Sequence, residues 1–302
     1  TDQRSETVNT MRTLIRREFW EHRGLWIAPL AIAGLLIVLS AVGGSIDIQL
    51  DDKHREVLEA LSPQKRMQMF GVLMSGLLVP QLVVMAIMLS IYLLDTLYAE
   101  RKDRSILFWK SLPVSDAQTV WSKFVTAMFA QPLLVYVISL ATSMLVYAVL
   151  RLRFADTPLG SLSSWDTETW LSMQGVLLAD TLIAAIWYAP LAAALLLISA
   201  WARRSVYMWA TLGPLLLMFL EKRIFGTTIL ARLLEYRCVG FFQAMGFKVA
   251  SHSDAPLEPA ANIYRSIDAT GLLASPDLWL GAAAAGGILW VTIRIRRFRD
   301  DT

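Results

Sequence analysis

Cysteine and charge are both scarce in this chain of 302 residues. Its single cysteine, Cys238, excludes an internal disulfide and a cysteine-based metal cluster. The three histidines, His22, His54 and His252, lie far apart without ligand-like spacing, so we predict no metal site. Only 18% of the residues are charged and 56% are hydrophobic, a composition that indicates a polytopic membrane protein.

Motifs of phosphate binding and catalysis are missing as well. The chain has no GxxxxGK followed by Ser or Thr, no HExxH, no GxSxG and no paired carboxylates within its apolar runs. We therefore expect a chain that is not an enzyme and does not bind ATP through a P-loop, so that energy for transport would come from a separate chain. The net charge of +3 is too small to indicate a nucleic-acid partner.

Long apolar runs predict membrane-spanning helices, since a helix needs roughly 20 mostly apolar residues to cross the hydrocarbon layer. Four runs meet this length, whereas the last two have only 16 uncharged residues each. The six predicted spans are residues 25–46, 70–95, 124–150, 171–202, 205–220 and 277–293. The first is too long for the apolar region of a cleaved signal peptide and is expected to stay as an anchor. The predicted fold is all-α, a single transmembrane domain over residues 1–302.

Lysine and arginine set the predicted orientation of these spans. With the N-terminus inside, the inner segments carry 16 basic residues, and the longer outer segments carry 12. Because cytoplasmic loops are enriched in basic residues, we predict that both termini lie in the cytoplasm.

Two polar segments keep a hydrophobic face. Residues 11–24 place four apolar side chains near one helical face with arginines around it, which predicts an interfacial helix facing anionic lipid, the alternative being a plain extension of the first span. These apolar residues are Leu14, Ile15, Phe19 and Trp20. The predicted outer loop, 221–276, contains a helical pattern from Ile229 to Leu234, compatible with a lateral or re-entrant helix and with a cap helix. In the last span, small residues four apart suit close helix packing: Gly281 with Ala285, and Ala282 with Gly286.

The segment between the second and third spans is charged and yet carries aromatic residues. Its first part should continue the second helix, and Pro113 should end that element. Ser115 and Gln118 then form a capping-box pattern that starts the third helix. Phe108 and Trp109 would have no lipid to bury against there, so we expect a partner protein surface to cover them.

Residues 100–123, ERKDRSILFWKSLPVSDAQTVWSK, resemble the cytoplasmic loop of bacterial ABC type-2 exporter permeases. The six-span layout is more loosely similar. The resemblance implies a six-helix bundle of that exporter kind, in which 97–113 is a coupling segment that docks on a separate ABC ATP-binding subunit holding ATP and Mg. It also implies pairing with a second permease copy, as a homodimer, in the bacterial inner membrane. The implied docking residues are Glu100, Arg101, Asp103, Arg104, Ser105, Phe108, Trp109 and Pro113.

Polar residues inside the spans are candidates for a transport pathway, because burying them in a membrane is costly. Gln81, Gln131 and Asp180 are the candidates, the alternative being that they link helices to one another. The rival class is a polytopic membrane enzyme or scaffold without an ATPase partner. Its strongest support is the acidic group around Asp51 and His54, which we interpret as a solvated helix start. The sequence does not specify the substrate or decide between homodimer and heterodimer.

Overall fold

The computed structural model describes residues 2–42, 74, 76–103, 114–153, 167–244 and 269–298. Every regular element within these residues is helical. The elements are α1 (Asp2–Glu21), α2 (Gly24–Val42), α5 (Leu78–Lys102), α7 (Asp116–Val125), the π-helical turn η2 (Thr126–Ala130), α8 (Gln131–Arg153), α10 (Thr167–Trp201), α11 (Val206–Phe225), α12 (Ile229–Ala244), α14 (Ala269–Ala274) and α15 (Pro276–Phe298). The all-α prediction is therefore confirmed.

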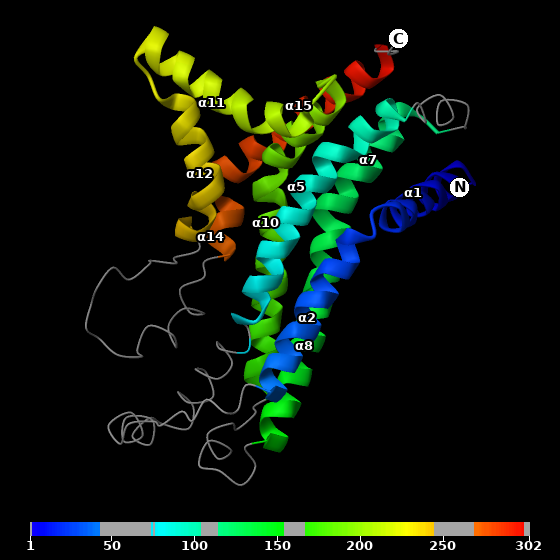
Figure 1. Ribbon diagram of the computed structural model, residues 1–302, viewed down its shortest axis with the longest axis vertical. Coiled ribbons are helices and arrows are strands. Elements are labelled where there is room, and N and C mark those ends of the chain that lie inside the picture. The colour runs from blue at the N-terminus through cyan, green and yellow to red at the C-terminus, as the bar shows by residue number, and fades with distance from the viewer. Residues whose placement is uncertain are drawn as a thin grey trace.

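The long helices form one bundle along the long axis of the molecule (Figure 1). α2 packs against α5 and α8, and α10 packs against α5 and α15. Within the described residues, five helical segments are long and apolar enough to cross a membrane: Gly24–Val42, Leu78–Lys102, Asp116–Arg153, Trp170–Trp201 and Pro276–Phe298. The chain is thus a multi-pass membrane protein. The N- and C-termini lie at the same end of the bundle, which we call the termini end (Figure 1).

The predicted fifth span forms a helix that differs from the other five. α11 is 20 residues long, but its last turn carries Glu221, Lys222 and Arg223, and it is not among the five membrane-crossing candidates. Most of its large apolar side chains are exposed, and the ribbon shows it leaving the bundle at the termini end, with α12 returning toward α10 (Figure 1). The count of six spans therefore stays a prediction.

The sequence signals at the start of the third helix are confirmed. The Ser115 hydroxyl accepts a hydrogen bond from the Gln118 backbone N–H at 3.2 Å, and the Gln118 side-chain oxygen accepts one from the Ser115 N–H at 2.9 Å. This reciprocal box satisfies two N–H groups that a helix start leaves unpaired. α5, in turn, continues to Lys102, well past the predicted end of its span. Both helices that flank the predicted coupling segment therefore extend toward it.

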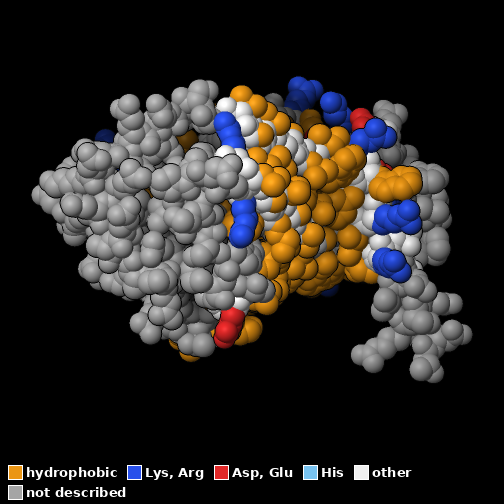
Figure 2. Space-filling view, turned by 90° about the horizontal axis from the view of Figure 1, so that it is seen from below, with side chains coloured by type: hydrophobic (Ala, Val, Ile, Leu, Met, Phe, Trp, Pro, Cys, Tyr) orange, Lys and Arg blue, Asp and Glu red, His pale blue; other side chains and the backbone are white. Residues whose placement is uncertain are grey.

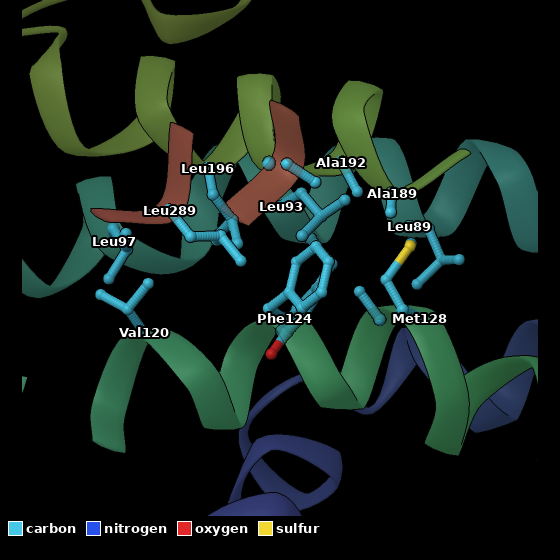
Figure 3. Close-up of a cluster of buried hydrophobic side chains, with 14 of the residues drawn as sticks. Leu89, Leu93, Leu97, Val120, Phe124, Met128, Ala189, Ala192, Leu196 and Leu289 are labelled. Carbon is cyan, nitrogen blue, oxygen red and sulfur yellow. The ribbon is translucent and has the colours of Figure 1, made fainter. Parts of the chain in front are cut away.

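The main apolar core joins five helices at the centre of the bundle (Figure 3). Leucines of α5 meet Val120, Phe124 and Met128 on one side and α10 on the other. Ala189, Ala192 and Ala193 of α10 are small, so α10 approaches its neighbours closely. The outer surface is hydrophobic as well: Figure 2 shows a broad hydrophobic face with lysine and arginine side chains at its margins. Such a face suits a helix bundle surrounded by lipid.

One of the two small-residue pairs predicted in α15, Gly281 with Ala285, lies where α15 packs closely against other helices. Ala285 is buried in the core, and Gly281 faces the Arg237 guanidinium of α12, which would have to shift to admit a Cβ atom. Gly286 of the other pair has open space beside it. α12 itself docks through Arg237, which lies 4.9 Å from the Trp187 ring centroid and donates a hydrogen bond to the Asp277 carbonyl at 2.7 Å.

Candidate functional site

Five charged side chains meet inside the bundle at the termini end, and we call them the ion cluster. They come from four helices: Glu18 of α1, Glu100 of α5, Asp116 and Lys123 of α7, and Arg296 of α15. The Lys123 ammonium lies 2.9 Å from a Glu18 oxygen and 3.0 Å from a Glu100 oxygen. Arg296 continues the chain of contacts, 2.6 Å from Glu100 and 3.0 Å from Asp116.

The centre of the ion cluster is withdrawn from solvent. Lys123 and Glu18 are each only 1% exposed, and burying an unpaired charge costs several kcal/mol. Here the ammonium also donates a hydrogen bond to the Thr96 hydroxyl at 2.7 Å, so it is held by a hydroxyl as well as by the two carboxylates. Glu18 in turn accepts a hydrogen bond from the Tyr92 hydroxyl at 2.9 Å. The charges are buried together, and their mutual contacts offset much of the desolvation cost.

The ion cluster lies at both ends of the predicted coupling segment. Glu100 is near the end of α5, and Asp116 is the first residue of α7. Through Arg296 both carboxylates are tied to the last helix, and through Lys123 one of them is tied to α1. Consequently, a displacement of Glu100 must move α1 and α15 with it or break a buried ion pair, and a displacement of Asp116 must move α15 or break its pair with Arg296.

A second link fixes the end of α5 to the end of α10. Arg101 donates hydrogen bonds to the carbonyl oxygens of Ser199 at 2.5 Å and Ala202 at 2.8 Å. The Ser199 hydroxyl accepts from the backbone N–H groups of Leu97 and Tyr98, each at 3.1 Å. Because these groups lie where both helices end, the carbonyls that lack a partner within α10 are satisfied by α5.

The structure thus places two predicted docking residues on the inside of the bundle. Glu100 and Arg101 contact neighbouring helices, so in this arrangement their side chains shape the base of the segment, whereas Asp103 is exposed at the end of α5. Their role in docking stays a prediction. The other predicted docking residues lie outside the described residues: Arg104, Ser105, Phe108, Trp109 and Pro113.

Two of the three pathway candidates link helices. Gln131 donates a hydrogen bond to the Leu25 carbonyl at 2.5 Å, and this carbonyl is the one that Pro29, four residues on, cannot satisfy because proline lacks an N–H. Gln81 of α5 donates to the Thr142 hydroxyl of α8 at 3.3 Å. Both glutamines are fully buried. In this conformation they join α2, α5 and α8, as the alternative interpretation expects, and their pathway role stays a prediction.

Asp180 of α10 is the third candidate and differs from the glutamines. It is 6% exposed, and within the described part of the chain neither carboxylate oxygen has a hydrogen-bond partner. An unsatisfied buried carboxyl group is costly inside a membrane and is typically kept for function. The buried side-chain oxygens of Gln81 and Gln131 also lack a partner there, but each glutamine donates a hydrogen bond, so Asp180 is the candidate whose surroundings most favour a functional role.

Among the described residues, one group of potential metal ligands shares Glu18 with the ion cluster. Donor atoms of Glu18, Glu21 and His22 lie within 4.8 Å of one another. Glu18 is already paired with Lys123, and Glu21 lies 2.6 Å from Arg17. Burial lowers the pKa of His22 below its ordinary 6.5, and Lys123 acts in the same direction against the nearby acidic groups. These carboxylates are engaged by cations of the chain, so we assign no metal to them.

Sequence reasoning missed most members of the ion cluster. Glu18 lies in the predicted amphipathic segment without any local signal for burial, yet it is buried in the bundle, as is Leu14 one turn earlier. In the sequence, Arg296 is one of several basic residues that follow the last predicted span. Opposite charges at the ends of predicted spans were the available signal, but partners such as Glu100 and Arg296, separated by 196 positions, cannot be matched without the fold.

The bundle and its charged end define a multi-pass transmembrane subunit. Residues 67–165 match the family described as ABC-2 family transporter protein. This range contains α5, α7, η2 and α8, together with the predicted coupling segment. The match covers about a third of the chain and supports an ABC type-2 permease, in agreement with the resemblance seen in residues 100–123. Neither the curated proteins nor the solved structures give a match.

Proposed function

We propose that this permease is the membrane subunit of an ATP-driven exporter and that a separate ATP-binding subunit, holding ATP and Mg, docks on residues 97–113. The family match supports this proposal, because ABC-2 permeases in general work with an ATP-binding subunit. The observation that carries it is the ion cluster, which holds both ends of the segment to α1 and α15. A loop that served only to connect two spans would not need four helices joined beneath it.

The proposed mechanism is mechanical. ATP binding and hydrolysis in the partner would move the docked segment, and the ion cluster would transmit that movement to α5 and the α7–α8 helix. Breaking a buried ion pair by removing a partner costs about 3–5 kcal/mol, so moving the helices together is the easier response. The helices around Gln81, Gln131 and Asp180 would then rearrange to admit the substrate.

The complete exporter would contain two permease copies in a bacterial inner membrane, with both termini in the cytoplasm. Support for a second copy comes from α11, on which Leu212, Leu215, Leu216 and Phe219 are all more than half exposed. A second permease is one surface that would cover them. The arginine-rich α1 and the basic end of α15 at the termini end support the cytoplasmic placement.

Docking can be tested by co-purification. The permease would be co-expressed with the ATP-binding subunit encoded beside it, and binding compared for wild type, Phe108→Asp and Trp109→Asp. Both substitutions should abolish association, because a carboxylate would replace an aromatic side chain in an apolar contact. Leu152→Asp is the matched control, since Leu152 is 82% exposed at the opposite end of α8. Undiminished association of both aromatic variants would refute the docking proposal.

Orientation can be tested with the native cysteine. Cys238 lies exposed on α12, within the loop proposed to be outside the cell. A membrane-impermeant maleimide should therefore label it in intact spheroplasts, and Cys238→Ser should remove the signal. Labelling that appears only after permeabilisation would place α12 in the cytoplasm and exclude the six-crossing arrangement.

A further inference from the structure

A groove lies in the elbow between α1 and α2, and we call it the elbow groove. Its volume is about 820 Å³, within the size range of ligand-binding sites. The end of α1 and the start of α2 form one wall with Phe19, Trp20 and Trp26, and α8 forms the other with Leu133 and Val137. The lining is therefore largely apolar and open toward the surroundings of the bundle.

One cation lies in the lining of this apolar groove. Arg23 is exposed and has no ion-pair partner among the described residues. The neighbouring arginines are engaged, Arg17 with Glu21 at 2.6 Å and Arg16 over the Trp20 ring at 5.3 Å from its centroid. The groove thus combines a free guanidinium with an apolar wall, which is the pattern expected for a ligand that is anionic at one end and apolar at the other.

The depth of these residues matches the two parts of a phospholipid. Arg23 immediately precedes α2, the first membrane-crossing candidate, at the termini end. Trp26, 39% exposed, lies within the first turn of α2, as interfacial aromatics do. Val137, 59% exposed, lies further along α8 toward the middle of the bundle. A headgroup at Arg23 and an acyl chain along α8 would fill the groove from polar end to apolar end.

We propose that the elbow groove is a binding site for one anionic phospholipid of the leaflet at the termini end. Arg23 pairs with the phosphate, and an acyl chain lies against Leu133 and Val137 under the indole of Trp26. A protein segment fits less well, because the lining is largely apolar, with one cationic side chain and no row of hydrogen-bonding groups for a backbone. This inference concerns the permease alone and is independent of any ATP-binding subunit.

Occupancy of the elbow groove would also brace the ion cluster. Phe19 and Trp20 follow Glu18 directly on α1, and Phe19 packs against the main core. A lipid against these two rings opposes movement of α1 away from α7, where Glu18 meets Lys123. Bound anionic lipid should therefore raise the thermal stability of the permease.

The proposal can be tested by native mass spectrometry of the purified full chain in detergent, titrated with dioleoylphosphatidylglycerol or dioleoylphosphatidylcholine. Wild type should bind one phosphatidylglycerol in preference to phosphatidylcholine. Arg23→Gln should weaken that binding about five-fold, the effect expected for one arginine near an anionic surface. Val137→Trp, which places a large ring in the groove, should remove the preferred lipid.

Matched controls separate the groove from the general surface. Arg203→Gln changes an exposed arginine in the α10–α11 connection, and Leu145→Trp changes a half-exposed residue on the same helix as Val137. Both should bind phosphatidylglycerol as wild type does. Equal binding of the two lipids by wild type would overturn the proposal. So would unchanged binding in both groove variants, equal losses in the controls, or displacement of the lipid by millimolar glycerol 3-phosphate, which has the phosphate but no acyl chain.

Discussion

Replacing Lys123 by methionine tests the central claim about the ion cluster. Methionine keeps most of the length of the side chain but removes the ammonium, and with it the contacts to Glu18, Glu100 and Thr96. Glu100 keeps its ion pair with Arg296 at 2.6 Å. Glu18, only 1% exposed, is then left with the hydroxyl donors of Tyr92 and Thr96 and, in the part of the chain that the structure describes, no cation at hydrogen-bond distance.

The loss of stability expected for Lys123→Met follows from the burial of Glu18. Removing one partner of a buried ion pair typically destabilises a protein by about 3–5 kcal/mol, because the remaining charge is buried without compensation. Glu18 retains hydroxyl partners, so we expect the lower end, about 3 kcal/mol. Adding Glu18→Gln to Lys123→Met removes the stranded charge, and the double variant should recover about 2 kcal/mol of that loss.

The free energy of unfolding can be measured by titration of the purified permease with sodium dodecyl sulfate in mixed micelles. Lys102→Met is the matched control, since Lys102 is exposed at the end of α5, and it should change stability by less than about 0.5 kcal/mol. A Lys123→Met variant within about 1 kcal/mol of wild type would refute the reasoning. Additive losses in the double variant would do so as well, because they would show that Glu18 and Lys123 do not depend on each other.

Two further predictions concern other parts of the fold. A Cβ atom on Gly281 would lie 2.5 Å from a guanidinium nitrogen of Arg237, so Gly281→Ala forces the guanidinium away from its hydrogen bond to the Asp277 carbonyl and should cost about 1 kcal/mol. Gly286→Ala, beside open space, should be neutral or stabilising, and equal effects of the two substitutions would contradict the tight fit at Gly281. Burial lowers the pKa of His22, so the unfolded chain binds more protons than the folded one and stability should fall as the pH drops below 6.5. His22→Gln should reduce the change in melting temperature between pH 7.5 and pH 5.5. An unchanged pH dependence in this variant would exclude a contribution of His22 to it.

The sequence by itself determined the class of the protein and most of its helices. Hydrophobic runs of about 20 residues can avoid unsatisfied backbone groups in lipid only as helices, so length and composition are enough to predict α2, α5, α8 and α10. The capping box at Ser115 was equally readable, because its two hydrogen bonds join residues three positions apart. Local signals of this kind do not depend on the tertiary arrangement.

Only the tertiary structure decided which polar residues meet. Glu18 bonds to Lys123 across 105 positions, and Gln131 reaches a carbonyl freed by a proline on another helix across 106. α11 is apolar enough to predict a span from sequence, yet in the fold its charged last turn leaves the bundle. Helical periodicity gives the face on which a side chain lies, but the charge facing it depends on how separate helices pack, and packing is a property of the whole bundle.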